Sequence, residues 1–135
     1  RATVRESVTI ILPLPPSVLS PNRPAGTRGG RFARAAAAKR YKRLARIATE
    51  EAQITSGPWE KATVAAAFYH KTARRRDDVN HLAMLKSAYD GVVDAGLLVD
   101  DDSEHLTTLP ASFAIDRDCP RVELTFTRHK KSPAG

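Results

Sequence analysis

The chain alternates between segments in which apolar residues recur at every second position and segments in which they recur every three or four. A two-residue period is typical of strands, whose successive side chains point to opposite faces of a sheet. It is clear in residues 62–70 and 121–127, where apolar side chains occupy every second position. We expect two further strands, at Val8–Leu12, a β-rich run ended by prolines, and at roughly His105–Ile115.

The helical period occurs in two other segments. From about Phe32 to Ile54, apolar residues recur at three- and four-residue steps, and Gly57-Pro58 follows as a helix-ending pair. His81–Ala95 has an apolar stripe with the same spacing, and Gly96 is a natural C-terminal stop. We expect a helix in each segment.

The resulting order, β-α-β-α-β-β, predicts a single α/β domain over residues 1–135, with one mixed sheet and helices packed on it. Residues 17–30 are rich in Pro and Gly and are expected to form a flexible loop, and residues 129–135 a disordered tail. Four large aromatic residues fall at strand or helix periods, so we expect them in the core and not on a base-stacking surface. They are Tyr41, Trp59, Phe68 and Tyr89.

Composition narrows the class of protein. At 135 residues the chain is long enough for one domain with a sizeable core, and it has no apolar run near the length of a membrane span. Cys119 is the only cysteine, which excludes an intrachain disulfide, and the four histidines lack the spacing of zinc ligands. We therefore expect a protein of the reducing cytoplasm without a zinc site.

The net charge of +7 is divided unevenly along the chain. Residues 1–76 hold 16 Lys and Arg against 4 Asp and Glu, a net charge of +12, whereas residues 77–135 hold 6 against 11, a net charge of −5. A basic half joined to an acidic half favours a polyanion-binding surface beside a metal-binding pocket. Basic composition is also typical of ribosomal or membrane-surface binding, but the acidic cluster argues against both.

The segment from Arg74 to Glu104 carries the most chemistry. Three arginines run directly into two aspartates, and a second acidic cluster, Asp100–Asp102, follows the second expected helix. Carboxylates are hard ligands for Mg²⁺ or Mn²⁺, and basic side chains hold the phosphate on which the metal acts. The two clusters can meet if residues 95–99 run back along the sheet. The alternative is a solvated loop and a charged turn.

Several short motifs follow one another along the chain. They are LPLPPS (Leu12 to Ser17), an Arg-rich run entering Asp77, Asn80, a Lys-x-x-x-Asp step (Lys86 to Asp90), Asp-Ala-Gly (Asp94 to Gly96), the Asp100-Asp101 pair and a final strand of the Arg-Val-Glu-Leu-Thr type (Arg121 to Thr125). In this order and spacing they resemble the RusA-type Holliday-junction resolvases of bacteria and their phages. The resemblance covers nearly the whole chain.

The resemblance implies a homodimeric, Mg²⁺-dependent endonuclease, with Mn²⁺ as an alternative metal, that nicks opposing strands of a four-way DNA junction during DNA recombination and repair. It would act in the cytoplasm of a bacterium or a phage-infected host cell. The implied catalytic residues are Asp77, Lys86 and Asp101. The implied metal ligands are Asp77, Asp100 and Asp101, and we add Asp78 for the reason given below. The expected DNA contacts are Arg23, Arg28, Arg74, Arg75 and Arg76, and the supporting polar residues are Asn80 and Asp90.

One position departs from the family motif. Where the family has a second aspartate this chain has Val79, and valine offers no oxygen to a metal. We predict that Asp78 takes over as the ligand, with Asn80 as the reserve candidate. Lys86 and Asp90 share a helix face, so the lysine either contacts a phosphate or pairs with that carboxylate.

Two other functions remain open. A catalytically impaired protein would keep the fold and the basic surface, and would bind junctions or replication forks without cutting them. A nuclease could also prefer flaps or forks to four-way junctions.

Overall fold

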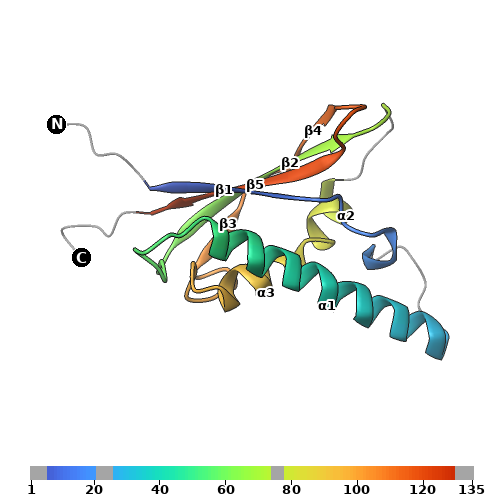
Figure 1. The fold of residues 1–135 in the computed structure, drawn as a ribbon, viewed down its shortest axis with the longest axis horizontal. Coiled ribbons are helices and arrows are strands. Elements are labelled where there is room, and N and C mark those ends of the chain that lie inside the picture. Colours follow the sequence, from blue (N-terminus) through green and yellow to red (C-terminus); the bar gives the residue numbers. More distant parts are fainter. Residues whose placement is uncertain (1–5, 21–25, 74–77, 130–135) are drawn as a thin grey trace.

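The computed structural model describes residues 6–20, 26–73 and 78–129, which form a sheet with all helices gathered on one of its faces (Figure 1). The elements in chain order are strand β1 (Ser7–Leu12), the short 3₁₀ helix η1 (Ser17–Leu19), helix α1 (Arg28–Glu51), strand β2 (Ala62–His70), helices α2 (Asp78–Ala83) and α3 (Lys86–Asp94), and strands β3 (Leu106–Thr108), β4 (Ser112–Ile115) and β5 (Arg121–Arg128).

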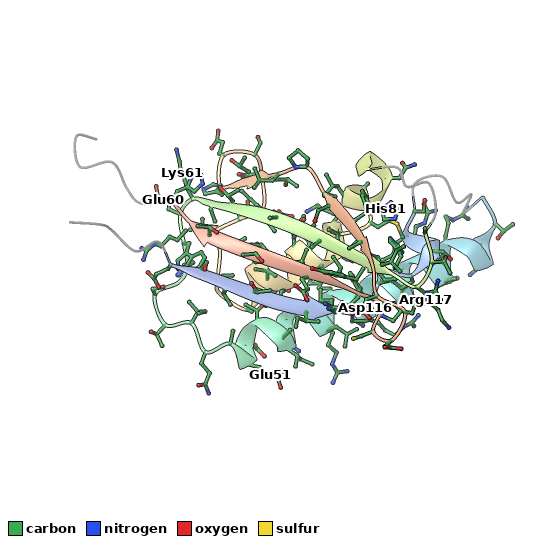
Figure 2. The ribbon with its side chains drawn as sticks, turned by 90° about the horizontal axis from the view of Figure 1, so that it is seen from above. Glu51, Glu60, Lys61, His81, Asp116 and Arg117 are labelled. Atoms are coloured by element: carbon green, nitrogen blue, oxygen red, sulfur yellow. The ribbon has the colours of Figure 1, made fainter. Side chains whose placement is uncertain are left out.

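The sheet is mixed, with strand order β1-β5-β2-β3. Strand β4 also pairs with β2, further along that strand than β3 does. The last strand, β5, is antiparallel to both β1 and β2, whereas β3 and β4 are parallel to β2. From the open side, β1, β5 and β2 lie side by side with the helices behind them (Figure 2). The predicted single α/β domain with a mixed sheet is thus confirmed.

Two elements expected as single pieces are divided. The strand expected at 105–115 is interrupted at Leu109-Pro110, because proline has no N–H for the ladder, and β3 and β4 pair with successive parts of β2. The helix expected at 81–95 is divided into α2 and α3 by a tight turn, in which the Leu85 amide donates to Leu82, three residues back.

The first long helix begins four residues earlier than expected and ends three residues earlier. Thr27 has extended backbone and its hydroxyl accepts a hydrogen bond from the Gly30 amide at 3.0 Å, so it is the N-cap of α1. The expected loop at 17–30 is accordingly shorter, since η1 occupies its beginning and α1 its end. Residues 21–25 and 130–135 lie outside the described residues.

The core lies between the helices and one face of the sheet. The strands bury alternate residues, as in β2, where Ala62, Val64, Ala66 and Phe68 are at most 2% exposed. The four aromatic residues expected in the core are all buried there: Tyr41, Trp59, Phe68 and Tyr89. Burying this many large apolar side chains is the main stabilisation of such a fold.

Helix α3 crosses α1 at Gly91, where the two backbones approach closely. A Cβ atom at Gly91 would collide with the carbonyl oxygen of Lys42 and lie 3.1 Å from the Cβ of Ala45. An ion pair of 3.1 Å between Lys42 and Asp94 spans the same crossing. This close approach fixes the position of α3. None of the described helices is long and apolar enough to cross a membrane.

Candidate active site

The first residue of α3, Lys86, lies between two carboxylates. Its Nζ is 2.8 Å from Asp90 Oδ1, one helical turn further along α3, and 2.6 Å from Asp101 Oδ2, in the loop that follows the helix. The i,i+4 ion pair is one of the two alternatives that the sequence left open for Lys86. The contact with Asp101 brings together two residues to which the family resemblance assigns catalytic roles.

A short segment after α3 positions Asp101. The Trp59 amide donates to Leu97 O at 2.6 Å and the Val99 amide donates to Trp59 O at 3.0 Å, so this segment runs parallel to the chain that enters β2. Residues 97–99 therefore lie beside the chain that enters the sheet at β2. The Asp101 amide then donates to Asp100 Oδ1 at 2.7 Å, which orients the two aspartates relative to each other.

The burial of the pair is asymmetric. The side chain of Asp101 is 11% exposed, whereas that of Lys86 is 67% exposed. A sheltered carboxylate thus holds a cation whose other side faces solvent. Such an ammonium can contact a phosphate without leaving Asp101, because it has three protons to donate.

The electrostatics follow from these contacts. Partial burial acts to raise the pKa of the Asp101 carboxyl, but the hydrogen bond and positive charge of Lys86, with further hydrogen bonds at Asp100 and the Asp101 backbone, lower that pKa overall. Hydrogen bonds to Asp101 and then to Asp90 raise the pKa of Lys86. At neutral pH the lysine is therefore a cation and the aspartate an anion.

The oxygen donors near Lys86 suit a hard divalent cation. Within 6–20, 26–73 and 78–129, no three His, Cys, Asp or Glu residues are grouped closely enough to hold a metal ion. A site here would therefore need ligands beyond Asp100 and Asp101. The predicted ones are Asp77, which lies outside the described residues, and Asp78, the first residue of α2, whose side chain lies outside them too.

The other predicted residues are placed as follows. Arg23, Arg74, Arg75 and Arg76 lie outside the described residues. Asn80 is half-buried in α2, and its backbone carbonyl oxygen accepts a hydrogen bond from the Met84 amide at 3.2 Å. Arg28 lies in the first turn of α1, with its guanidinium carbon 5.8 Å from the centre of the Phe32 ring.

An aromatic cluster holds α2 against the sheet, and sequence reasoning did not identify it. The His81 ring lies edge-on to Phe68, His70 and Phe113, with centroid distances of 5.0, 5.3 and 5.0 Å. These partners belong to β2 and β4, so the cluster holds α2, the helix that follows the Arg-Asp stretch, against the sheet. Phe113 is 32 positions from His81, and no local spacing indicates a contact at that separation.

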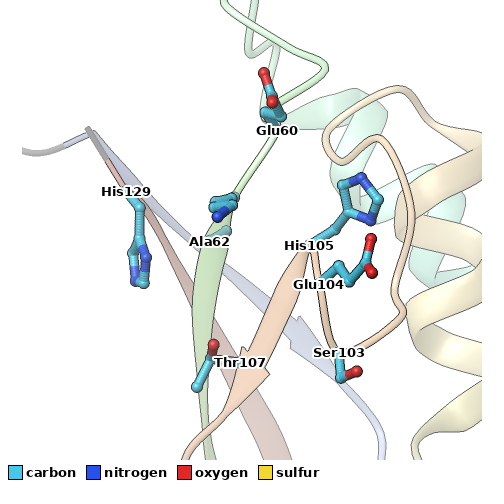
Figure 3. Close-up of a pocket in the computed structure, with 8 residues that line it drawn as sticks. Glu60, Ala62, Ser103, Glu104, His105, Thr107 and His129 are labelled. Carbon is cyan, nitrogen blue, oxygen red and sulfur yellow. The ribbon is translucent and has the colours of Figure 1, made fainter. Parts of the chain in front are cut away.

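A separate cavity of about 480 Å³ lies at the start of β2 (Figure 3). Its lining includes Glu60, Lys61, Glu104, His105 and His129, and none of these is a predicted site residue. Asp102 holds His105 through a contact of 2.6 Å between Oδ1 and Nδ1. This hydrogen bond raises the pKa of His105.

No family model matches the chain, and no curated protein matches it either. The resemblance to RusA-type resolvases therefore depends on the motifs and on the residues that carry them.

Proposed function

We propose that the protein is a metal-dependent, structure-selective DNA endonuclease that resolves Holliday junctions and other branched DNA by paired nicking. The observation that carries the proposal is the 2.6 Å contact between Lys86 and Asp101, which are 15 positions apart in the chain. A lysine cation beside a sheltered carboxylate, on a protein with an excess of positive charge, suits the hydrolysis of a phosphodiester.

Each residue has a distinct role in this proposal. Asp101, with Asp77, Asp78 and Asp100, would hold Mg²⁺, which supplies an activated water and a positive charge at the phosphate. Lys86 stays protonated and contacts the non-bridging oxygens of the scissile phosphate, where negative charge develops in the transition state. Asp90 also holds the ammonium, through a hydrogen bond of 2.8 Å within α3.

The DNA would be held mainly by the basic half of the chain. Arg74–Arg76 immediately precede Asp77, so phosphate contacts and metal ligands are adjacent in the sequence. Paired nicking of a two-fold junction calls for two active sites related by the same symmetry, and we therefore propose a homodimer.

The test is a labelled synthetic four-way junction incubated with the protein, with and without Mg²⁺ or Mn²⁺. We expect metal-dependent cleavage, with linear duplex cut far less. Asp77→Asn and Asp101→Asn should each remove cleavage and leave junction binding intact. Each substitution removes a charged ligand of the metal ion but no contact with a phosphate. Full cleavage by both variants would contradict the site assignment.

A binding-only protein is the second candidate, favoured by Val79 at the position of a family ligand. It predicts junctions that are bound but stay intact at every Mg²⁺ and Mn²⁺ concentration. Two substitutions examine the ligand set directly. If Asp78 is a ligand, Asp78→Ala severely lowers activity, and Val79→Asp raises the metal affinity or the rate. If Asp78→Ala is harmless and Val79→Asp strongly activates, the site lacks a ligand. Flap and fork substrates in the same assay distinguish the third candidate.

A further inference from the structure

The N-terminal turns of α1 extend past the sheet. The first buried residue of the helix is Ala37, so residues 28–36 contribute no buried side chain. Figures 1 and 2 both show this end of α1 projecting beyond the sheet, at the end of the molecule that carries α2. Arg34 ties the base of the projection to the chain around η1, donating to Val18 O at 3.0 Å and to Ser20 O at 3.3 Å.

Phe32 lies on this projection and is 65% exposed, the most exposed large apolar side chain in the described ranges. Arg28 stacks on its ring, and both line a shallow hollow with Arg31 and Ala35. A partner that covered this ring would remove apolar surface from water, which is favourable. Every other Phe, Tyr or Trp of the described ranges is at most 37% exposed.

The charge around Phe32 indicates what kind of partner would cover its ring. Between Glu6 and Glu50 the chain has nine Lys and Arg and no Asp or Glu. Lys42 and Arg46 form ion pairs in the C-terminal half of α1, whereas Arg28 and Arg31 form none with the described residues. The projecting half is therefore strongly positive, so a second copy of it would be repelled and a polyanion attracted.

We infer that the projecting end of α1, residues 28–35, is a second DNA-contact surface that recognises the branch point. Phe32 stacks on a base that the junction leaves unstacked, and Arg28 and Arg31 contact the flanking phosphates. An aromatic ring stacks on any base, so the contact is independent of sequence. The interior of a duplex offers no such base, so Phe32 contributes to selectivity for branched structure. The inference rests on the proposed function and adds a specificity-determining residue outside the lysine–carboxylate cluster.

The experiment measures binding of the full chain, without metal, to a fluorescent four-way junction and to a linear duplex of the same length. Phe32→Ala should weaken junction binding by about ten-fold, because stacking on one base is worth about 1–3 kcal/mol. Duplex binding should change by less than about two-fold, and Phe32→Tyr should bind as the wild type does. Leu44→Ala is the matched control, since Leu44 is an exposed apolar residue (44%) further along the same basic helix.

Arg31→Ala separates charge from stacking. It should weaken binding to junction and duplex alike and reduce the slope of log K against log salt by about one, as expected for the loss of one phosphate contact. A fluorescent base analogue at the branch point should report stacking with wild-type protein and Phe32→Tyr, but not with Phe32→Ala.

Four results would overturn the inference: wild-type junction affinity in Phe32→Ala, an equal loss on junction and duplex, no DNA binding by the wild type, or a change of mass in light scattering on substituting Phe32. The last would assign the surface to a second copy of the chain. Because no metal is present, a wild-type protein that binds junctions but does not cut them defeats the nuclease proposal and leaves this inference standing.

Discussion

Two cations in this molecule are each held by two carboxylates, and they are held in different ways. Lys86 contacts Asp90 and Asp101. Arg121, the first residue of β5, donates to Asp116 and to Glu123 at 2.7 Å each, and to the carbonyl oxygen of Cys119 at 2.8 Å. In the sequence each is a basic residue with acidic neighbours, and the structure shows how differently the two are held.

The two groups differ in the sequence separation of their partners and in the exposure of the cation. The partners of Arg121 are within five residues of it, so the group closes the turn before β5, and the guanidinium also covers the Tyr69 ring at 4.0 Å. Lys86 instead joins α3 to a loop 15 positions further on, and its ammonium remains mostly exposed. A local charge group stabilises a turn, whereas a long-range group with an exposed cation can also serve a substrate.

The largest expected effect separates the two groups by activity. Lys86→Met should lower the single-turnover rate of junction cleavage by about 100-fold, since removing one preorganised charge from a transition state typically costs that much. Its effect on the melting temperature should be moderate, because the Lys86 side chain is 67% exposed but Asp101, which is 11% exposed, loses its cation. Arg121→Met should leave the rate near normal and lower the free energy of unfolding more than Lys86→Met does, because two carboxylates and the Cys119 carbonyl lose their donor. If Arg121→Met removes cleavage at a temperature where the protein is folded, the comparison fails.

The next effect concerns the helix that carries Lys86. Gly→Ala within a helix normally stabilises by up to about 1 kcal/mol, but at Gly91 the new Cβ would meet the backbone of Lys42, which cannot move aside cheaply. We expect Gly91→Ala to lower the free energy of unfolding by about 2 kcal/mol. Because α3 would shift from α1, cleavage should fall as well, while Arg121 on β5 is unaffected.

The control for that substitution is Gly29→Ala. Gly29 lies in α1 with no atom within 4 Å of an added Cβ, so alanine there should be neutral or stabilising. Chemical denaturation of both variants measures the difference. Equal stability of the two would show that the helix crossing tolerates a side chain at Gly91.

Much of the fold could be predicted because it follows from local patterns. Strand β2 begins and ends at the expected residues, and its alternation of buried and half-buried side chains is regular from Ala62 to Tyr69. The break between α2 and α3 could not be predicted. The stripe through Leu82, Leu85 and Tyr89 continues across it, and periodicity reports the positions of side chains and not the hydrogen bonds between them.

The candidate site divides along the same line. The Lys86–Asp90 pair follows from helical spacing alone. The Lys86–Asp101 contact requires residues 97–99 to lie beside Trp59, which is a long-range pairing that no window of sequence contains. Motif order suggested that these residues belong together, and a tertiary contact brings them together.

A smaller effect is expected at Asp90. Asp90→Asn keeps the shape of the side chain and removes the charge that holds Lys86 from the helix side, so we expect a loss of about ten-fold in cleavage rate without a change in junction affinity. The matched control is Glu50→Gln, because Arg46 and Glu50 form an exposed i,i+4 pair on α1. An unchanged rate in Asp90→Asn would contradict this role for Asp90 and show that Asp101 alone positions Lys86.

The smallest effect concerns Asp102 and His105, a third charge pair, which is as local as the Arg121 group. Asp102 Oδ1 accepts from the backbone amides of Glu104 and His105 at 3.1 Å each, besides contacting the His105 ring. Its hydrogen bond to the ring raises the pKa of His105, so NMR titration should show a pKa above 6.5 that returns towards 6.5 in Asp102→Asn.

The pH dependence of stability has a definite sign. The folded state favours protonated His105, so the pair contributes its full stability below about pH 6.5, and the contribution is lost as pH rises through the raised pKa of the folded state. The stability difference between the wild type and Asp102→Asn should therefore shrink between mildly acidic and alkaline pH, while cleavage stays near the wild-type rate. Loss of cleavage in Asp102→Asn would instead place Asp102 in the site beside Asp101. The sequence distance between partners would then no longer distinguish charge groups that stabilise the fold from the group proposed to act in catalysis.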